Sequence, residues 1–131
     1  MLIRAAIAAF VLLFMSSAFA EEQLGVAVYP GATYDQVRTK ILRESLSAKG
    51  AAYRTSAPIA EVVAYYKKQG LLFLKIGSPS KESARFKKVD ADVDVIVQSP
   101  WQDAQTGATM TDTLIMIFKK EEKKEKPDAL I

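Results

Sequence analysis

The sequence contains no cysteine and no histidine in 131 residues. Without these side chains the protein has no cysteine nucleophile, no histidine-activated serine, no thiol redox chemistry and no histidine or cysteine metal ligand. It also cannot form a disulfide, so packing alone must stabilise its fold. Most catalytic designs of small domains are thereby excluded, and we expect no catalytic, cofactor-binding or metal-binding residues.

The sequence also has little net charge and, after residue 20, no long apolar run. Its 18 lysines and arginines nearly balance 15 aspartates and glutamates, for a net charge of +3. Such a balance argues against a nucleic-acid partner. A spanning helix needs about 20 apolar residues, so we expect no transmembrane segment after residue 20.

Residues 1–20 have the layout of a secretory signal peptide. Arg4 supplies a positive charge, residues 5–15 are apolar, and Ala18-Phe19-Ala20 forms a small-x-small cleavage site. The apolar stretch is shorter than the roughly 20 residues of a membrane anchor. We therefore expect cleavage after Ala20 and a periplasmic or secreted protein.

The remaining 111 residues suit a single domain. We expect this domain over residues 21–119. Residues 120–131 are mostly charged, so we expect them to form a flexible tail.

Near the mature start, residues 28–34 read VYPGATY. Proline fixes its own φ and glycine tolerates positive φ, so Pro30 and Gly31 suit the two central positions of a type II turn. We expect a short apolar strand over residues 24–29 before this turn.

Two segments have helical spacing. Over residues 33–49 the apolar stripe is thin, with Thr33 as candidate N-cap and Gly50 as the end signal. Over residues 56–69 the pattern is clearer, with Ser56 as N-cap and Gly70 at the end. Its apolar face consists of Ile59, Val62, Val63 and Tyr66.

Strands are predicted over residues 51–55, 71–76, 84–88, 89–98 and 109–119, with a hairpin loop over 99–108. Residues 89–98 alternate, which predicts a core face and a solvent face carrying the aspartates. The order of elements predicts an α+β fold, with an antiparallel sheet of three to five strands and one or two helices packed on one face.

Two features are candidate partner-binding sites. The basic residues Lys81, Arg85, Lys87 and Lys88 either meet an anionic sugar, lipid head group or acidic partner, or form an ordinary solvated face. Trp101, in a Ser-Pro-Trp loop, either anchors a partner at the surface or folds back over the end of the core.

The carboxylates give a weaker signal. Alternate side chains on a strand stand about 6–7 Å apart, which is too far for Asp90, Asp92 and Asp94 to surround one calcium ion. A glycan hydrolase would instead need two carboxyl groups about 5 or 6.5–9.5 Å apart across a cleft. The candidates for such a pair are Asp90, Asp92, Asp94, Asp103 and Glu61.

Several segments together resemble a group of small exported bacterial proteins with no assigned activity. These segments are VYPGATY, AAYRTSAPIAEVVAYYKKQG, VIVQSPWQDAQTG and TDTLIMI. The group opens with Tyr-Pro-Gly-Ala and continues with a Tyr-x-Thr strand and a Val-Val-x-Tyr-Tyr-Lys helix. The resemblance implies an α+β fold and an exported location, and it brings no catalytic residues.

The sequence thus favours a non-enzymatic binding or accessory protein of the cell envelope, whose partner is a protein or an envelope component. The alternative is a carboxylate-dependent enzyme acting on an envelope glycan. A third reading is an assembly role through an edge strand. The sequence leaves the oligomeric state and the strand order open.

Overall fold

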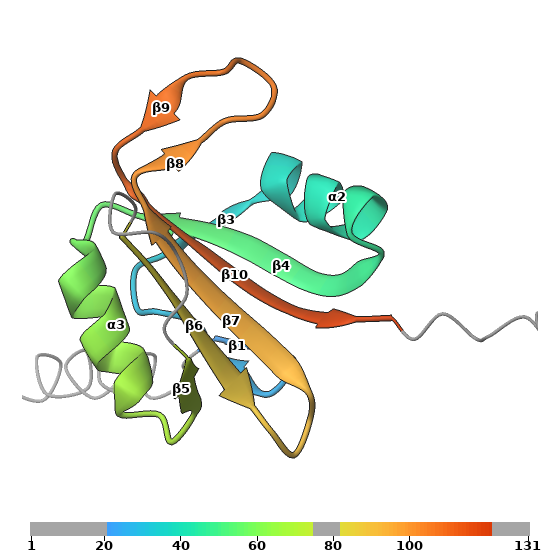
Figure 1. The fold of residues 1–131 in the computed structure, drawn as a ribbon, viewed down its shortest axis with the longest axis vertical. Coiled ribbons are helices and arrows are strands. Elements are labelled where there is room, and N and C mark those ends of the chain that lie inside the picture. The colour runs from blue at the N-terminus through green and yellow to red at the C-terminus, as the bar shows by residue number, and fades with distance from the viewer. Residues whose placement is uncertain (1–20, 75–81, 122–131) are drawn as a thin grey trace, which may run out of the picture.

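The computed structural model describes residues 21–74 and 82–121 (Figure 1). The expected leader, nearly all of the expected tail and Lys81 lie outside these residues. The described elements are β1 (Glu22–Gln23), β2 (Val26–Ala27), β3 (Thr33–Asp35), α2 (Gln36–Ser45), β4 (Ala48–Thr55), α3 (Ile59–Lys67), β5 (Leu72–Leu74), β6 (Glu82–Lys88), β7 (Val93–Ser99), β8 (Trp101–Gln102), β9 (Thr109–Met110) and β10 (Thr113–Lys120).

The main sheet is antiparallel throughout and has the strand order β3-β4-β10-β7-β6-β5. Two small two-stranded sheets, β1-β2 and β8-β9, complete the described fold. The predicted α+β class with an antiparallel sheet is confirmed. The sheet has six strands rather than three to five, since β3 at one edge adds a short strand to those predicted over residues 51–119.

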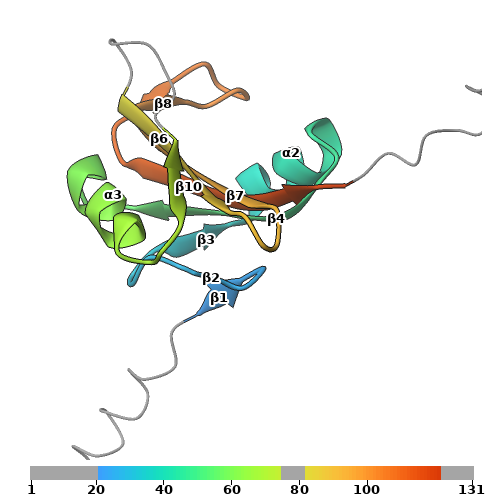
Figure 2. The same ribbon diagram turned by 60° about the horizontal axis from the view of Figure 1, so that its bottom comes forward.

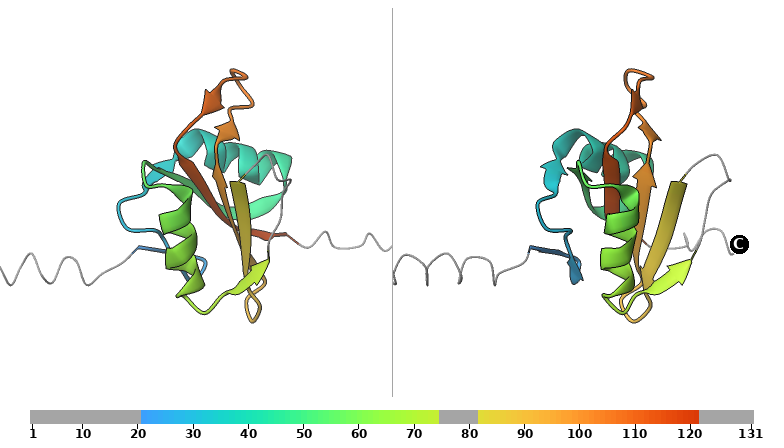
Figure 3. Two further views of the ribbon diagram at one scale, coloured as in Figure 1. Left: turned by 60° about the vertical axis from the view of Figure 1, so that its left-hand side comes forward. Right: turned by 90° about the vertical axis from the view of Figure 1, so that its left-hand side faces the viewer.

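One face of the sheet is covered by α3 and the N-terminal segment. Val62 and Tyr66 of α3 are buried among side chains of the central strands, including Phe86, Val95 and Ile117. Figure 3 shows α3 lying alongside β6. This face contains the main core of the protein.

The opposite face is partly covered by α2, where Leu42 is buried with Ala48 and Phe118. Ile117 and Phe118 are neighbours on β10 and therefore point to opposite faces. Figure 2 shows α2 on one side of the sheet and the β1-β2 hairpin on the other. The two helices thus pack on opposite faces, not on one as expected, because β4 and β10 carry apolar side chains on both sides.

The Pro-Gly pair forms the predicted type II turn. The Ala32 N–H donates to the Tyr29 carbonyl at 3.0 Å, and Gly31 has φ +84°. The hydroxyl of Tyr66 accepts from the Tyr29 N–H at 3.1 Å and donates to the Ala27 carbonyl at 2.9 Å. These two hydrogen bonds therefore attach the turn to α3. Burial of the Tyr66 hydroxyl raises its pKa.

The predicted limits of both helices were wrong. Thr33 lies in β3, and the N-cap of α2 is Asp35, whose Oδ1 accepts from the Arg38 N–H at 2.8 Å. Gly50 lies inside β4 rather than ending the helix, and a Cβ there would overlap the Ile117 carbonyl oxygen. The second helix begins at Ile59 after Pro58, with no side-chain cap from Ser56.

The strand predicted over residues 89–98 begins only at Val93. Lys88 pairs with Val93, so residues 89–92 form the turn between β6 and β7, and Asp92 has φ +55°. Val89 is consequently 66% exposed instead of facing the core. The predicted loop over residues 99–108 also contains β8, which follows a cis Ser99-Pro100 bond.

Candidate functional site

Trp101 is almost fully buried at the start of β8. Its side chain is 5% exposed, and its Nε1–H donates to Asp112 Oδ1 at 3.0 Å. The indole packs with Ala52 and Leu114 on the α2 side of the sheet. Of the two alternatives for this residue, the structure therefore shows the one in which it folds back over the core.

Arginines and aspartates surround this indole, and we call the five residues Trp101, Arg38, Arg54, Asp103 and Asp112 the Trp101 cluster. The guanidinium carbons of the two arginines lie 5.1 and 5.0 Å from the ring centroid. Arg38 pairs with Asp103 at 2.6 Å, and Arg54 pairs with Asp112 at 2.7 Å. The hydrogen bond to Asp112 raises the pKa of Arg54. The charge of each arginine is therefore compensated by an aspartate.

An open cleft of about 630 Å³ lies beside the Trp101 cluster. It brings together segments that are distant in sequence, including Gly31 and Thr33 at and after the Pro-Gly turn, Arg54 and Ser56, and Asp112. Arg54 is held there between Asp112 at 2.7 Å and Asp35 at 3.8 Å. The cleft therefore offers hydrogen-bonding groups but no uncompensated positive charge.

The basic residues do not form one patch. Arg85 and Lys87 point to one face of β6 and Lys88 to the other, because side chains alternate along a strand. Arg85 is occupied by the buried Asp94, to which its Nη2 bonds at 2.8 Å. Lys87 pairs with Asp92 at 2.8 Å, and the Lys88 ammonium donates to the Gly25 carbonyl at 3.1 Å.

Most of the carboxylates named for a hydrolase are paired with cations. Asp94 bonds to Arg85, Asp92 to Lys87 and Asp103 to Arg38. Asp90 is exposed in the β6-β7 turn, and Glu61 is exposed in the first turn of α3. Within residues 21–74 and 82–121, no three acidic side chains are grouped so that they could hold a metal ion.

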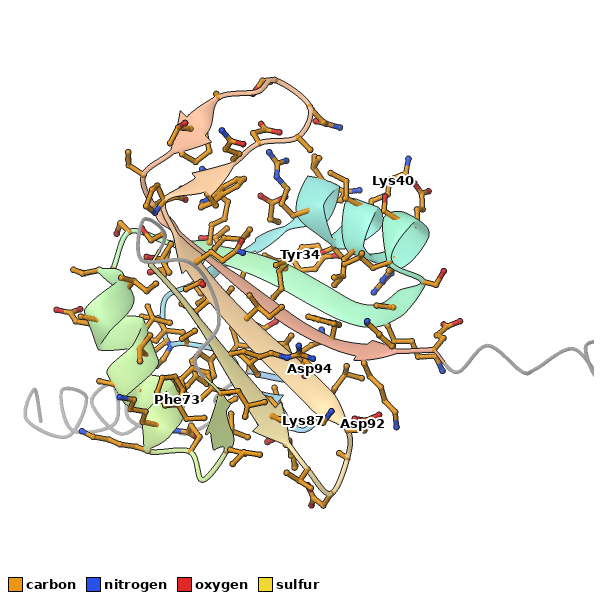
Figure 4. The ribbon with its side chains drawn as sticks, viewed as in Figure 1. Tyr34, Lys40, Phe73, Lys87, Asp92 and Asp94 are labelled. Carbon is orange, nitrogen blue, oxygen red and sulfur yellow. The ribbon has the colours of Figure 1, made fainter. Side chains whose placement is uncertain are left out.

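Lys87 and Lys88 do take part in another surface, at the end of the molecule where α3 ends and β6 turns into β7 (Figure 1). We call residues 67–74 and 87–92 the basic pole. The segment from the end of α3 through β5 brings Lys67, Lys68 and three apolar residues to this end. Figure 4 shows Phe73, Lys87 and Asp92 in this half of the molecule, away from Tyr34 and Lys40.

The apolar side chains of the basic pole are unusually exposed. Leu72 is 50% exposed, Phe73 40%, Leu74 39% and Val89 66%. Between the two segments lies an open hollow of about 660 Å³, lined by Leu71, Leu72, Lys87, Lys88, Val89 and Asp90 among others. The hollow is therefore bordered by both apolar and charged side chains.

The basic pole carries four lysines and two aspartates. Its one salt bridge among the described residues joins Lys87 to Asp92, and this hydrogen bond raises the pKa of Lys87 and lowers that of Asp92. The ammonium of Lys67 lies 4.6 Å from the centroid of the Phe73 ring. Positive charge thus surrounds exposed apolar surface.

Sequence reasoning missed most of this surface. Residues 71–76 were interpreted as a strand and Lys67 and Lys68 as helix-terminal charges, while Val89 was expected in the core. The available signal was the run LLFL directly after KKQG, because a strand with apolar residues at consecutive positions needs cover on both faces.

No family model, curated protein or solved structure matches this chain.

Proposed function

We propose that this protein is an exported, non-enzymatic domain that binds a component of the cell envelope through the basic pole. The observation that carries the proposal is the concentration of exposed apolar side chains there. Of the seven large apolar side chains that are exposed in the described residues, four belong to the basic pole: Leu72, Phe73, Leu74 and Val89. Contiguous exposed apolar surface with a polar rim is typical of interaction sites.

The signal-peptide pattern of residues 1–20 supports export, as does the resemblance to small exported proteins. The described helices include none that is long and apolar enough to cross a membrane. The pairing of Asp92, Asp94 and Asp103 with cations favours a binding role over a carboxylate enzyme, because a general acid or base must exchange its proton with substrate.

Sedimentation with a bacterial envelope fraction tests this proposal. The pole variant is Leu72→Ser/Val89→Ser. The matched control is Leu46→Ser/Val37→Ser, which removes the same two residue types from α2 and its C-cap, where Leu46 is 51% and Val37 40% exposed. We expect at least about a tenfold loss of binding for the pole variant, since two apolar side chains leave the contact, and little change for the control.

Two results would overturn the proposal. One is a wild-type protein that stays in the supernatant at every envelope concentration. The other is an equal loss of binding by the pole variant and the control, which would place the contact elsewhere. Circular dichroism of both variants confirms that each is folded before binding is compared.

A further inference from the structure

We infer that the partner of the basic pole is a lipid surface with anionic head groups. This inference rests on the proposed function and names the chemistry of the partner.

The strand β5 lies at the edge of the sheet and exposes apolar side chains on both of its sides. Leu72 and Leu74 pair with Lys87 and Arg85, whereas Phe73 pairs with Phe86 and packs against it with ring centroids 5.2 Å apart. Each of the three remains 39–50% exposed. Such side chains can enter the boundary between head groups and acyl chains without a change of fold.

Lysines surround these side chains. Lys67 lies over the Phe73 ring, Lys68 follows it at the end of α3, and Lys87 and Lys88 end β6. A lysine stem can lie along apolar surface while its ammonium reaches outward. Each lysine held near an anionic membrane strengthens binding about fivefold, and this attraction falls off within a Debye length.

Charge disfavours a second copy of the chain as the partner of the basic pole, and the length of β5 disfavours a partner strand added to it. Two copies meeting pole to pole would bring two sets of four lysines together against only two aspartates each. A partner strand added to β5 would pair along only three residues, and the affinity of strand addition comes from main-chain hydrogen bonds. An anionic lipid surface satisfies the lysines and the apolar side chains at once.

Flotation with lipid vesicles tests this inference. The probes are vesicles of phosphatidylcholine alone and vesicles in which about one third is phosphatidylglycerol. The lysine variant is Lys67→Gln/Lys68→Gln, and the matched control is Lys40→Gln/Lys120→Gln, which removes two exposed lysines from α2 and β10. Both variants have the same net charge.

We expect the wild type and the control to bind the anionic vesicles, more weakly as salt rises, and to bind phosphatidylcholine at least about tenfold less well. The lysine variant should lose about twenty- to thirtyfold, because each of the two missing lysines contributes about fivefold. Equal binding to both vesicle types, or equal losses in both variants, would overturn the inference.

Absence of vesicle binding would also overturn it, and the envelope experiment then separates the two proposals. If envelope binding persists but disappears after protease treatment of the envelope, the partner is a protein and the proposed function stands. If the protein binds neither vesicles nor envelope, both proposals fail. A pole-dependent dimer in sedimentation velocity would assign the surface to a second copy and overturn the lipid inference.

Discussion

The Trp101 cluster and the basic pole both place cations beside large apolar side chains, yet they differ in burial and in charge. Trp101 is 5% exposed and both neighbouring arginines are paired with aspartates. At the basic pole, Leu72 is 50% exposed, and the four lysines outnumber the two aspartates. Compensated cations over a buried ring stabilise the fold, whereas excess positive charge around exposed apolar surface is the feature on which the proposed binding surface rests.

The largest expected effect on stability is at the Trp101 cluster. Trp101→Ala should lower the free energy of unfolding by about 3–5 kcal/mol, because it removes a buried aromatic side chain and leaves a cavity. Urea denaturation measures this loss. A loss below about 1 kcal/mol, typical of exposed positions, would show that the indole does not hold the fold together.

A smaller loss is expected for Asp112→Ala. This carboxylate accepts hydrogen bonds from both Trp101 Nε1 and Arg54 Nε. Its removal should cost about 1–3 kcal/mol, since a buried donor and a cation lose their acceptor. Asp90→Ala, an exposed aspartate of the pole, is the control and should be nearly neutral in the same urea titration.

The acid sensitivity of the fold should depend on Asp103. The hydrogen bond from the Gln105 N–H, together with Arg38, lowers the pKa of Asp103. A carboxyl group whose pKa is lowered in the folded state stabilises the protein above its unfolded pKa of about 3.9, and this stabilisation is lost as pH falls through the folded value. Asp103→Asn should therefore flatten the decline of unfolding free energy below about pH 4 relative to the wild type. Equal slopes for the variant and the wild type would contradict this account.

The smallest expected effect on stability is at the pole itself. Leu72→Ser should change the free energy of unfolding by less than about 1 kcal/mol, because half of the side chain is already in water. The same urea titration measures it. A loss as large as that of Trp101→Ala would mean that Leu72 belongs to the core and would break the contrast between the two regions.

The sequence predicted the parts of the fold that depend on neighbouring residues. Pro30 and Gly31 determine their turn by backbone preference alone, and the apolar face of α3 repeats within nine residues. Helix and strand limits were less accurate because tertiary pairing decides them. Asp35, not Thr33, caps α2, because Thr33 belongs to β3 and pairs with Arg54 of β4.

The candidate site was predicted only in part. Lys87 and Lys88 were identified from charge density, but side chains alternate along β6, so the two point to opposite faces of the sheet. Arg85 was named with them, but it is paired with Asp94. The exposure of Leu72 and Val89 depends on β5 being an edge strand and on the turn at residues 89–92. Neither property can be derived from a local pattern, since both follow from strand order and register.

Hydrogen–deuterium exchange with and without a bacterial envelope fraction would test most directly that the basic pole is the binding surface. The account predicts slower exchange on binding in residues 67–74 and 87–92. Residues 99–112, which contain Trp101 and Asp112, should exchange at unchanged rates. Protection confined to residues 99–112, with the pole unaffected, would contradict the account.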